Sequence, residues 1–404
     1  MRRLIIILLL TPLTLLAKGV GDFDLHFYGI IRSDLFYNSR DNVETVDGLF
    51  YMYPKDHNYD PLGNDLNDTP QGSFHSIYTR LGVDINGPRL GSAATSAKVE
   101  IDFRGSGSNY AMPRIRQAYF NLDWGRWALL VGQTWHPLFG EVSPSVLNLS
   151  TGAPFQPFNR SPQVRGRFTR NRWQLTASAI WQSQFNSIGP AGKSSRYIKY
   201  SNIPELYIGA DYRHGPWTAG IGGEMLSLKP RTEATIDDVT YKVNERVTSL
   251  SAEAHIKYRG PLWMASAKTT LANNLTHTSM LGGFGVIETD PTNHQCRYTP
   301  FHHSMTWVNL VYGKRWQPGI FAGYLKNLGT SHPITGQTYG EGLDIDQLLG
   351  VSAQISYNPD HWRFGVEVST STAWYGTLRP SDGRVVDTHS VTNLRVAATA
   401  QFIF

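Results

Sequence analysis

Residues 391–404, VTNLRVAATAQFIF, alternate between apolar and polar side chains and end on an aromatic residue. One file of every second residue is apolar: Leu394, Val396, Ala398, Ala400, Phe402 and Phe404. The other file carries Asn393, Arg395, Thr399 and Gln401. A period of two is that of a β-strand with one apolar and one polar face. The segment indicates either a half-buried strand of a soluble sandwich or the closing strand of a membrane barrel, in which no backbone edge is left unpaired in lipid.

The N-terminal residues favour export and so the second interpretation. The basic start MRR at residues 1–3 precedes an apolar stretch at 4–16, and Ala17 is followed by Lys18. This pattern predicts a secretory signal peptide over residues 1–17 and a mature chain of 18–404. No later run approaches the roughly 18 apolar residues of a membrane-spanning helix, so a mature membrane protein would have to cross with strands.

The composition fits a chain whose strands have water on one face. Hydrophobic residues make up 41% and charged residues 17%, and the mean hydropathy is -0.30. Aromatic residues reach 12%, with 20 Tyr and 11 Trp, which suit the two membrane interfaces. Loss of Arg2 and Arg3 with the signal peptide lowers the formal net charge from +5 to +3, and no clustered basic face predicts a nucleic-acid partner. The single cysteine, Cys296, excludes an intramolecular disulfide.

Seven tight connections are rich in Gly, Pro and Asn, whose backbone angles suit turns. They lie at residues 86–88, 123–126, 169–172, 214–216, 259–261, 313–315 and 358–361. The segments that follow six of them begin with tryptophan: Trp127, Trp173, Trp217, Trp263, Trp316 and Trp362. Tryptophans at one level relative to the turns are typical of an aromatic belt at a membrane interface.

Eight long connections separate these turns. They lie at residues 39–73, 105–111, 136–161, 186–202, 230–244, 276–300, 329–346 and 375–388. Fifteen connections predict an all-β fold, a transmembrane antiparallel β-barrel of about 16 strands with short periplasmic turns and long extracellular loops, in the outer membrane of a Gram-negative bacterium. A barrel of about this size leaves a water-filled channel.

Charged residues occupy the faces that would point into this channel. The predicted lumen-facing bases are Arg32, Arg80, Lys98, Arg104, Arg114, Arg116, Arg165 and Arg167. The predicted lumen-facing acids on the same strands are Asp34, Asp84, Glu100 and Asp102. If the bases align, they form a strip that favours the passage of anions. Alternatively, the acids pair with the bases and leave the wall neutral.

Residues 136–161 form the one predicted loop with much apolar content, and several prolines stiffen it. A loop surrounded by water gains no stability from these apolar residues. We therefore predict that it folds into the barrel, narrows the pore and presents Glu141 opposite the arginines. The alternative is a loop packed on the outer rim or on a neighbouring subunit.

No motif of a catalytic nucleophile, a zinc protease or a P-loop is found, so the sequence predicts neither an enzyme nor a cofactor. His294, Cys296, His302 and His303 lack the paired spacing of a zinc site. The acidic residues of 39–73 lack the regular spacing of a calcium loop. No metal site is predicted.

Two stretches carry a family resemblance. They are YTRLGVDI at residues 78–85 with KVEIDF at 98–103, and RIRQAYFNL at 114–122 with LLVGQTW at 129–135. Here the chain resembles the porin-like outer-membrane proteins of the DcaP type. The resemblance covers about the first third of the chain, and it implies a trimeric channel for small, often anionic solutes, with basic lumen residues at Arg80, Arg114 and Arg116.

The functional prediction is a porin, a passive diffusion channel for small hydrophilic solutes with a preference for anions. The alternative is a non-conducting outer-membrane barrel that acts as a structural or surface-interaction protein. The predicted partners are outer-membrane lipid, small solutes, further copies in a homotrimer, and the barrel assembly machinery, which would recognise the strand ending at Phe404.

Overall fold

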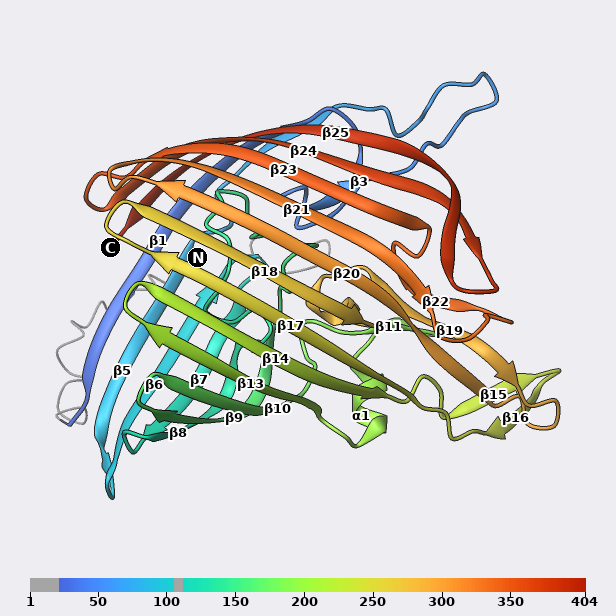
Figure 1. Cartoon of the computed structure of the whole chain (residues 1–404), viewed down its shortest axis with the longest axis horizontal. Coiled ribbons are helices and arrows are strands. Elements are labelled where there is room, and N and C mark those ends of the chain that lie inside the picture. Colours follow the sequence, from blue (N-terminus) through green and yellow to red (C-terminus); the bar gives the residue numbers. More distant parts are fainter. Residues whose placement is uncertain (1–21, 105–111) are drawn as a thin grey trace, which may run out of the picture.

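A computed structural model describes residues 22–104 and 112–404. The predicted signal peptide at 1–17 and the predicted loop at 105–111 lie outside the described residues. Sixteen strands of the described chain form one closed antiparallel wall (Figure 1). In order around the wall they are β1 (Asp24–Asn38), β5 (Arg80–Leu90), β6 (Ala93–Asp102), β7 (Arg114–Asp123), β8 (Trp127–Trp135), β9 (Arg160–Arg170), β10 (Trp173–Ile180), β13 (Glu205–His214), β14 (Trp217–Leu228), β17 (Val247–Arg259), β18 (Trp263–Asn273), β20 (Cys296–Tyr312), β21 (Trp316–Thr330), β23 (Ile345–Tyr357), β24 (Trp362–Arg379) and β25 (Arg384–Ile403).

The two ends of the chain close the barrel. β25 pairs with β1 from Ile30 opposite Ile403 to Asn38 opposite Arg395. The last residue adds two backbone hydrogen bonds, because Gly29 N donates to Phe404 O at 2.8 Å and Phe404 N donates to Gly29 O at 3.1 Å. The predicted closing strand is therefore confirmed. On the other side of β1, β5 pairs with residues 24–30 and β4 (Gln71–His75) pairs with residues 34–38.

Side chains alternate between the two faces of the wall as the period of two requires. On β25, Leu394 and Val396 are 41% and 37% exposed, whereas Asn393 and Arg395 are 0% and 4% exposed. The same holds on β24, where Val366 and Val368 face outward and Glu367 is buried inside. The exterior is thus an apolar surface, and the polar groups line the interior, which is the arrangement of a barrel that crosses a membrane.

Short turns connect the strands at one end of the barrel, and six of the seven lie where the sequence predicts them. The first hairpin differs, because β5 continues through Pro88 to Leu90 and turns at residues 91–92. Its pairing with β6 shifts register after Gly87, and such a bulge accommodates a proline that cannot donate a ladder hydrogen bond.

The six predicted tryptophans each begin a strand and point outward, and each ring lies 4.5 to 5.0 Å from an aromatic ring of an adjacent strand. These pairs form a belt of aromatic side chains near the turns.

The longer connections at the other end contain short elements of their own. They are β2 (Asn42–Thr45), β3 (Phe50–Pro54), β11 (Ile188–Gly189), β12 (Gly192–Lys193), α1 (Arg196–Ser201), β15 (Glu233–Ile236), β16 (Val239–Lys242), η2 (Thr276–Thr278), β19 (Gly282–Thr289) and β22 (Thr338–Glu341). Figure 1 shows β15 and β16 projecting beyond the wall. In the part of the chain that the structure describes, no helix is long and apolar enough to span a membrane.

The predicted long loop at 375–388 is wrong. β24 continues to Arg379 and β25 begins at Arg384, so only residues 380–383 connect them. The hairpin extends past the apolar part of the wall, where polar residues on both faces hide the period of two.

Candidate functional site

Nine cationic side chains lie on the inner side of neighbouring strands and form what we call the basic wall. They come from β1, β5, β6, β7 and β9 and from the residue positions that directly follow β6: Arg32, Arg80, Lys98, Arg104, Arg114, Arg116, Arg160, Arg165 and Arg167. Eight of them are the bases selected from the sequence. The strand order β1–β5–β6–β7–β8–β9 brings together segments more than a hundred residues apart.

Part of the basic wall is paired with the predicted acids. Asp34 lies 2.7 Å from Arg32, and Asp84 lies 2.9 Å from Lys98. Asp102 is fully buried and contacts Arg114 and Arg116 at 2.8 Å each.

Glu100 contacts Arg116 at 2.7 Å and Arg80 at 3.6 Å. All four predicted acids are therefore engaged with cations of the wall. They neutralise it only in part, since nine cations face four carboxylates.

A bulge in β7 turns two consecutive side chains, Arg116 and Gln117, toward the same carboxylate, Glu100. Ile101 of β6 lies opposite Ile115, whereas Glu100 lies opposite Gln117, so Arg116 is an additional residue in the ladder. A bulge redirects the side chains around it. Ile115 stays outside while Arg116 is buried inside.

Tyr78 lies at the centre of the basic wall, in the segment between β4 and β5. Its ring is 5.1 to 5.5 Å from four guanidinium carbons, those of Arg32, Arg80, Arg104 and Arg116. Its hydroxyl oxygen accepts a hydrogen bond of 2.6 Å from Arg80. An aromatic face attracts cations, and it allows these four to share a small space.

Arg104 and Arg160 are the buried cations of the wall without an acidic partner among the described residues. Within residues 22–104 and 112–404, all three nitrogens of the Arg160 side chain lack a hydrogen-bond acceptor. Nε and Nη1 of Arg104 lack one as well. The guanidinium carbon of Arg160 lies 4.7 Å from the ring of Trp135 and 5.4 Å from that of Phe158. A buried cation costs several kcal/mol unless an anion or acceptor meets it.

The sequence prediction missed Arg160 because it falls inside the predicted loop at 136–161. The structure makes it the first residue of β9. Two further inward arginines, Arg363 on β24 and Arg395 on β25, were not among the predicted lumen-facing bases. The period of two places both on the polar faces of their strands.

Residues 136–159, which we call the inner loop, follow β8. They contact inward-facing side chains of β18, β20 and β23. Lys268 of β18 donates to Leu138 O at 2.6 Å. Ser145 N donates to Asn309 of β20 at 2.8 Å, and Gln354 of β23 donates to Ser145 O at 2.9 Å.

The far end of the inner loop is held by one carboxylate and one guanidinium. Glu367 of β24 accepts from Leu147 N at 2.9 Å and from Asn148 Nδ2 at 2.7 Å. Arg32 of the basic wall donates to Leu147 O at 2.6 Å.

Apolar side chains of the inner loop pack on the same strands. Phe155 lies over Gly323 and Gly350, where an added Cβ would come within 2.4 and 2.6 Å of its ring. Gln156 accepts a hydrogen bond of 2.9 Å from the indole of Trp307. The largest buried apolar cluster of the described chain joins the loop to this part of the wall.

Glu141 lies at the β9 end of the basic wall, beside strand β13. Its carboxylate is 2.7 Å from Arg213 of β13, and its carbonyl accepts from Lys257 of β17. The acid is therefore near Arg165, the predicted arginine of β9, and beside Arg213, rather than among the paired arginines of β5 to β7.

A closed barrel of sixteen strands, apolar outside, with a charged wall and a folded-in loop inside, has the architecture of the porins. The comparisons with solved structures agree. The outer membrane channel DcaP of Acinetobacter baumannii is 18% identical with a TM-score of 0.66, and the match covers 95% of this chain and 98% of that one. OmpT, an outer membrane protein of Vibrio cholerae, is 13% identical with a TM-score of 0.57, over 95% of this chain and 98% of that one.

A trimer form of the same OmpT matches at 14% identity with a TM-score of 0.57, over 95% and 99% of the two chains. At these identities the likeness shows a shared fold. No protein-family model and no curated protein sequence matches the chain.

Proposed function

We propose that this protein is an outer-membrane channel through which small hydrophilic solutes diffuse passively, with a preference for anions. The observation that carries the proposal is the excess of cations on the basic wall, above all the buried guanidinium groups of Arg104 and Arg160. A charged lining sets the selectivity of a pore, because it raises the local concentration of the opposite charge.

The inner loop is the proposed constriction. It starts at the end of β8, is held mainly on β18, β20, β23 and β24, and meets the basic wall at Arg32 and Arg160, so a solute would pass beside the loop and the remaining arginines. Its many contacts with inward-facing side chains support a fixed position rather than a swinging lid.

The outer surface of the barrel supports the proposed location in the outer membrane. An apolar surface with an aromatic belt suits outer-membrane lipid. Insertion by the barrel assembly machinery through the strand that ends at Phe404 remains part of the proposal, as does a homotrimer, for which the trimer form of OmpT is a precedent.

The reversal potential across a planar bilayer in asymmetric potassium chloride tests the anion preference. One charge about 8 Å from an anion contributes roughly 0.5 kcal/mol in water, about a twofold change in local concentration. Because each charge raises local chloride and lowers local potassium about twofold, the double variant Arg104→Gln, Arg160→Gln should lower the chloride-to-potassium permeability ratio by roughly sixteenfold.

Lys314→Gln, in the short turn at 313–315, removes a charge outside the wall and serves as the control. Arg167→Gln, at a half-buried position of β9 without an acidic partner in the described chain, covers the case in which the double variant does not fold. A wild-type channel that prefers potassium would refute the proposal.

A second candidate function has one observation in its favour. The apolar cluster between the inner loop and the wall occupies part of the interior, and a lumen that is fully closed would make the barrel a structural or surface-interaction protein. Bilayer recordings that never yield discrete channels from folded protein would favour this candidate.

A further inference from the structure

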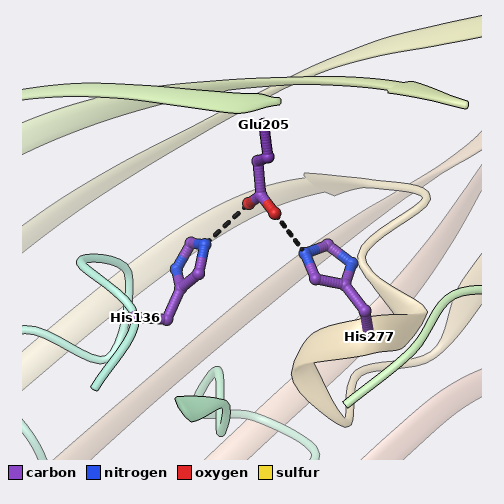
Figure 2. Close-up of side chains that lie close together, drawn as sticks. All are labelled: His136, Glu205 and His277. Carbon is purple, nitrogen blue, oxygen red and sulfur yellow. Dashed lines mark hydrogen bonds and ion pairs between the residues drawn. The ribbon is translucent and has the colours of Figure 1, made fainter. Parts of the chain in front are cut away.

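Three buried side chains from distant parts of the chain meet inside the barrel (Figure 2). His136 begins the inner loop, Glu205 is the first residue of β13, and His277 belongs to η2. His136 Nε2 lies 2.6 Å from Glu205 Oε1, and His277 Nε2 lies 2.9 Å from Glu205 Oε2. Their potential ligand atoms all lie within 4.8 Å of one another.

A second carboxylate lies beside this group. Glu224 of β14 is 3% exposed and close enough to Glu205 for the two charges to repel each other. Ser251 is its other polar neighbour. Neither oxygen of Glu224 has a well-formed hydrogen bond within the described residues.

The hydrogen bonding of the group is incomplete. Glu205 Oε2 and both ring nitrogens of His277 lack a well-formed partner in the described chain, although the ion-pair distance between two of these atoms is short. Buried polar atoms are normally satisfied, so several unsatisfied atoms around one point call for an explanation. Two neutral imidazoles and two carboxylates would also leave two negative charges buried together.

We propose that His136, Glu205 and His277, with Glu224 as the fourth ligand, bind one divalent transition-metal ion of the zinc type. Imidazole nitrogen and carboxylate oxygen are ligands of zinc, and one ion would balance both carboxylates. In a tetrahedral site with bonds of about 2.0 Å the ligand atoms lie roughly 3.3 Å apart. The two nitrogen–oxygen distances to Glu205 are shorter than this value, and the ligand atoms of the three residues lie within 4.8 Å of one another, so small side-chain shifts would form a three-ligand core toward which Glu224 would move.

Binding requires one local change. Leu138 N now donates to His136 Nδ1 at 3.1 Å, which places the proton of the neutral ring on Nε2. When the metal takes Nε2 the proton moves to Nδ1, and the contact with Leu138 opens. One neutral hydrogen bond is small beside the coordination of a metal ion by four ligands.

The consequence would be structural. The ion would join the start of the inner loop to β13, β14 and η2, and so would fix the base of the loop. Because the group is buried, the ion enters either during folding or when the loop moves.

The test uses the full-length protein, with Zn²⁺ or Co²⁺ alone as the probe. The metal is supplied once during refolding and once to folded barrels, and after dialysis it is measured by mass spectrometry. We expect about one ion per chain and the visible absorption bands of low-coordinate Co²⁺. His277→Gln and Glu224→Gln should each lose most of the bound metal.

His255→Gln is the matched control. The side chain of His255 is 6% exposed and contacts two carboxylates, Asp211 at 2.9 Å and Glu253 at 3.1 Å, but it has no second histidine beside it among the described residues. This variant should keep its metal. Wild-type protein that takes up no ion under either condition would overturn the proposal, as would full metal content in folded His277→Gln. If the variants do not fold, the Co²⁺ spectrum of the wild type decides.

Discussion

Replacing Glu367 by alanine should release the far end of the inner loop. The carboxylate accepts two good hydrogen bonds, from Leu147 N at 2.9 Å and Asn148 Nδ2 at 2.7 Å, and it is buried. A hydrogen bond to a charged group contributes about 1.5 kcal/mol or more, so the two contribute roughly 3 kcal/mol. Since about 1.4 kcal/mol is a factor of ten, the ratio of undocked to docked loops should rise by about a hundredfold.

Single-channel recording measures this release. Wild-type channels should show one main conductance, and Glu367→Ala should add frequent openings of larger conductance. Glu367→Gln removes the same charge but keeps an acceptor oxygen, so it should lie between the two. If Glu367→Ala and Glu367→Gln give channels of the same conductance, loss of the negative charge, and not loss of the hydrogen bonds to the loop, causes the change. A Glu367→Ala channel with wild-type conductance would show that this carboxylate does not hold a constriction.

Three further outcomes are expected. Deletion of residues 147–154 should enlarge the single-channel conductance if the inner loop is the constriction, and unchanged conductance would contradict that role. Gly29→Ala places a Cβ 2.5 Å from the Phe404 ring and should reduce the fraction of folded, heat-modifiable barrel in gels, whereas Gly166→Ala, with open space around it, should have little effect. The Arg379 guanidinium lowers the pKa of Asp382 to about 2. Their ion pair in the β24–β25 hairpin should therefore be fully present above the ordinary aspartate pKa, and amide exchange at the hairpin tip should accelerate only as the pH falls through about 2.

The barrel could be predicted because lipid imposes a simple pattern. Every strand needs one apolar face, and every short turn needs residues with turn-forming backbone angles. These local signals are present in the sequence at almost every position where a strand begins near a turn. They weaken beyond the membrane, where the β24–β25 hairpin continues without an apolar face.

The alternation of apolar and polar residues fails on strands whose inward side chains pack against protein instead of water. On β20, Met305 and Trp307 point inward because the inner loop covers them, so this strand carries apolar residues on both faces. On β7 the bulge at Arg116 changes which residues face outward. Both features depend on contacts with other segments, and no local pattern encodes them.

The candidate site was predicted in part for the same reason. The cations of strands β1 to β9 follow the period of two and could be selected from the sequence. Arg160 could not, because Asn159, Ser161 and Pro162 are turn-forming residues that extend the apparent loop past the start of β9. In the sequence, about seventy residues separate His136 from Glu205 and Glu205 from His277. Only the closure of the barrel brings the three together.

The strands hold the inner loop by its main chain. Lys268, Gln354 and Arg32 donate to carbonyl oxygens of the loop, and Asn309 and Glu367 accept from its amides. Such anchors do not depend on which side chains the loop carries. Evolution or an engineer can therefore exchange the loop side chains that face the arginines without rebuilding the barrel that supports them, and in the proposed channel such exchanges would change which solutes pass.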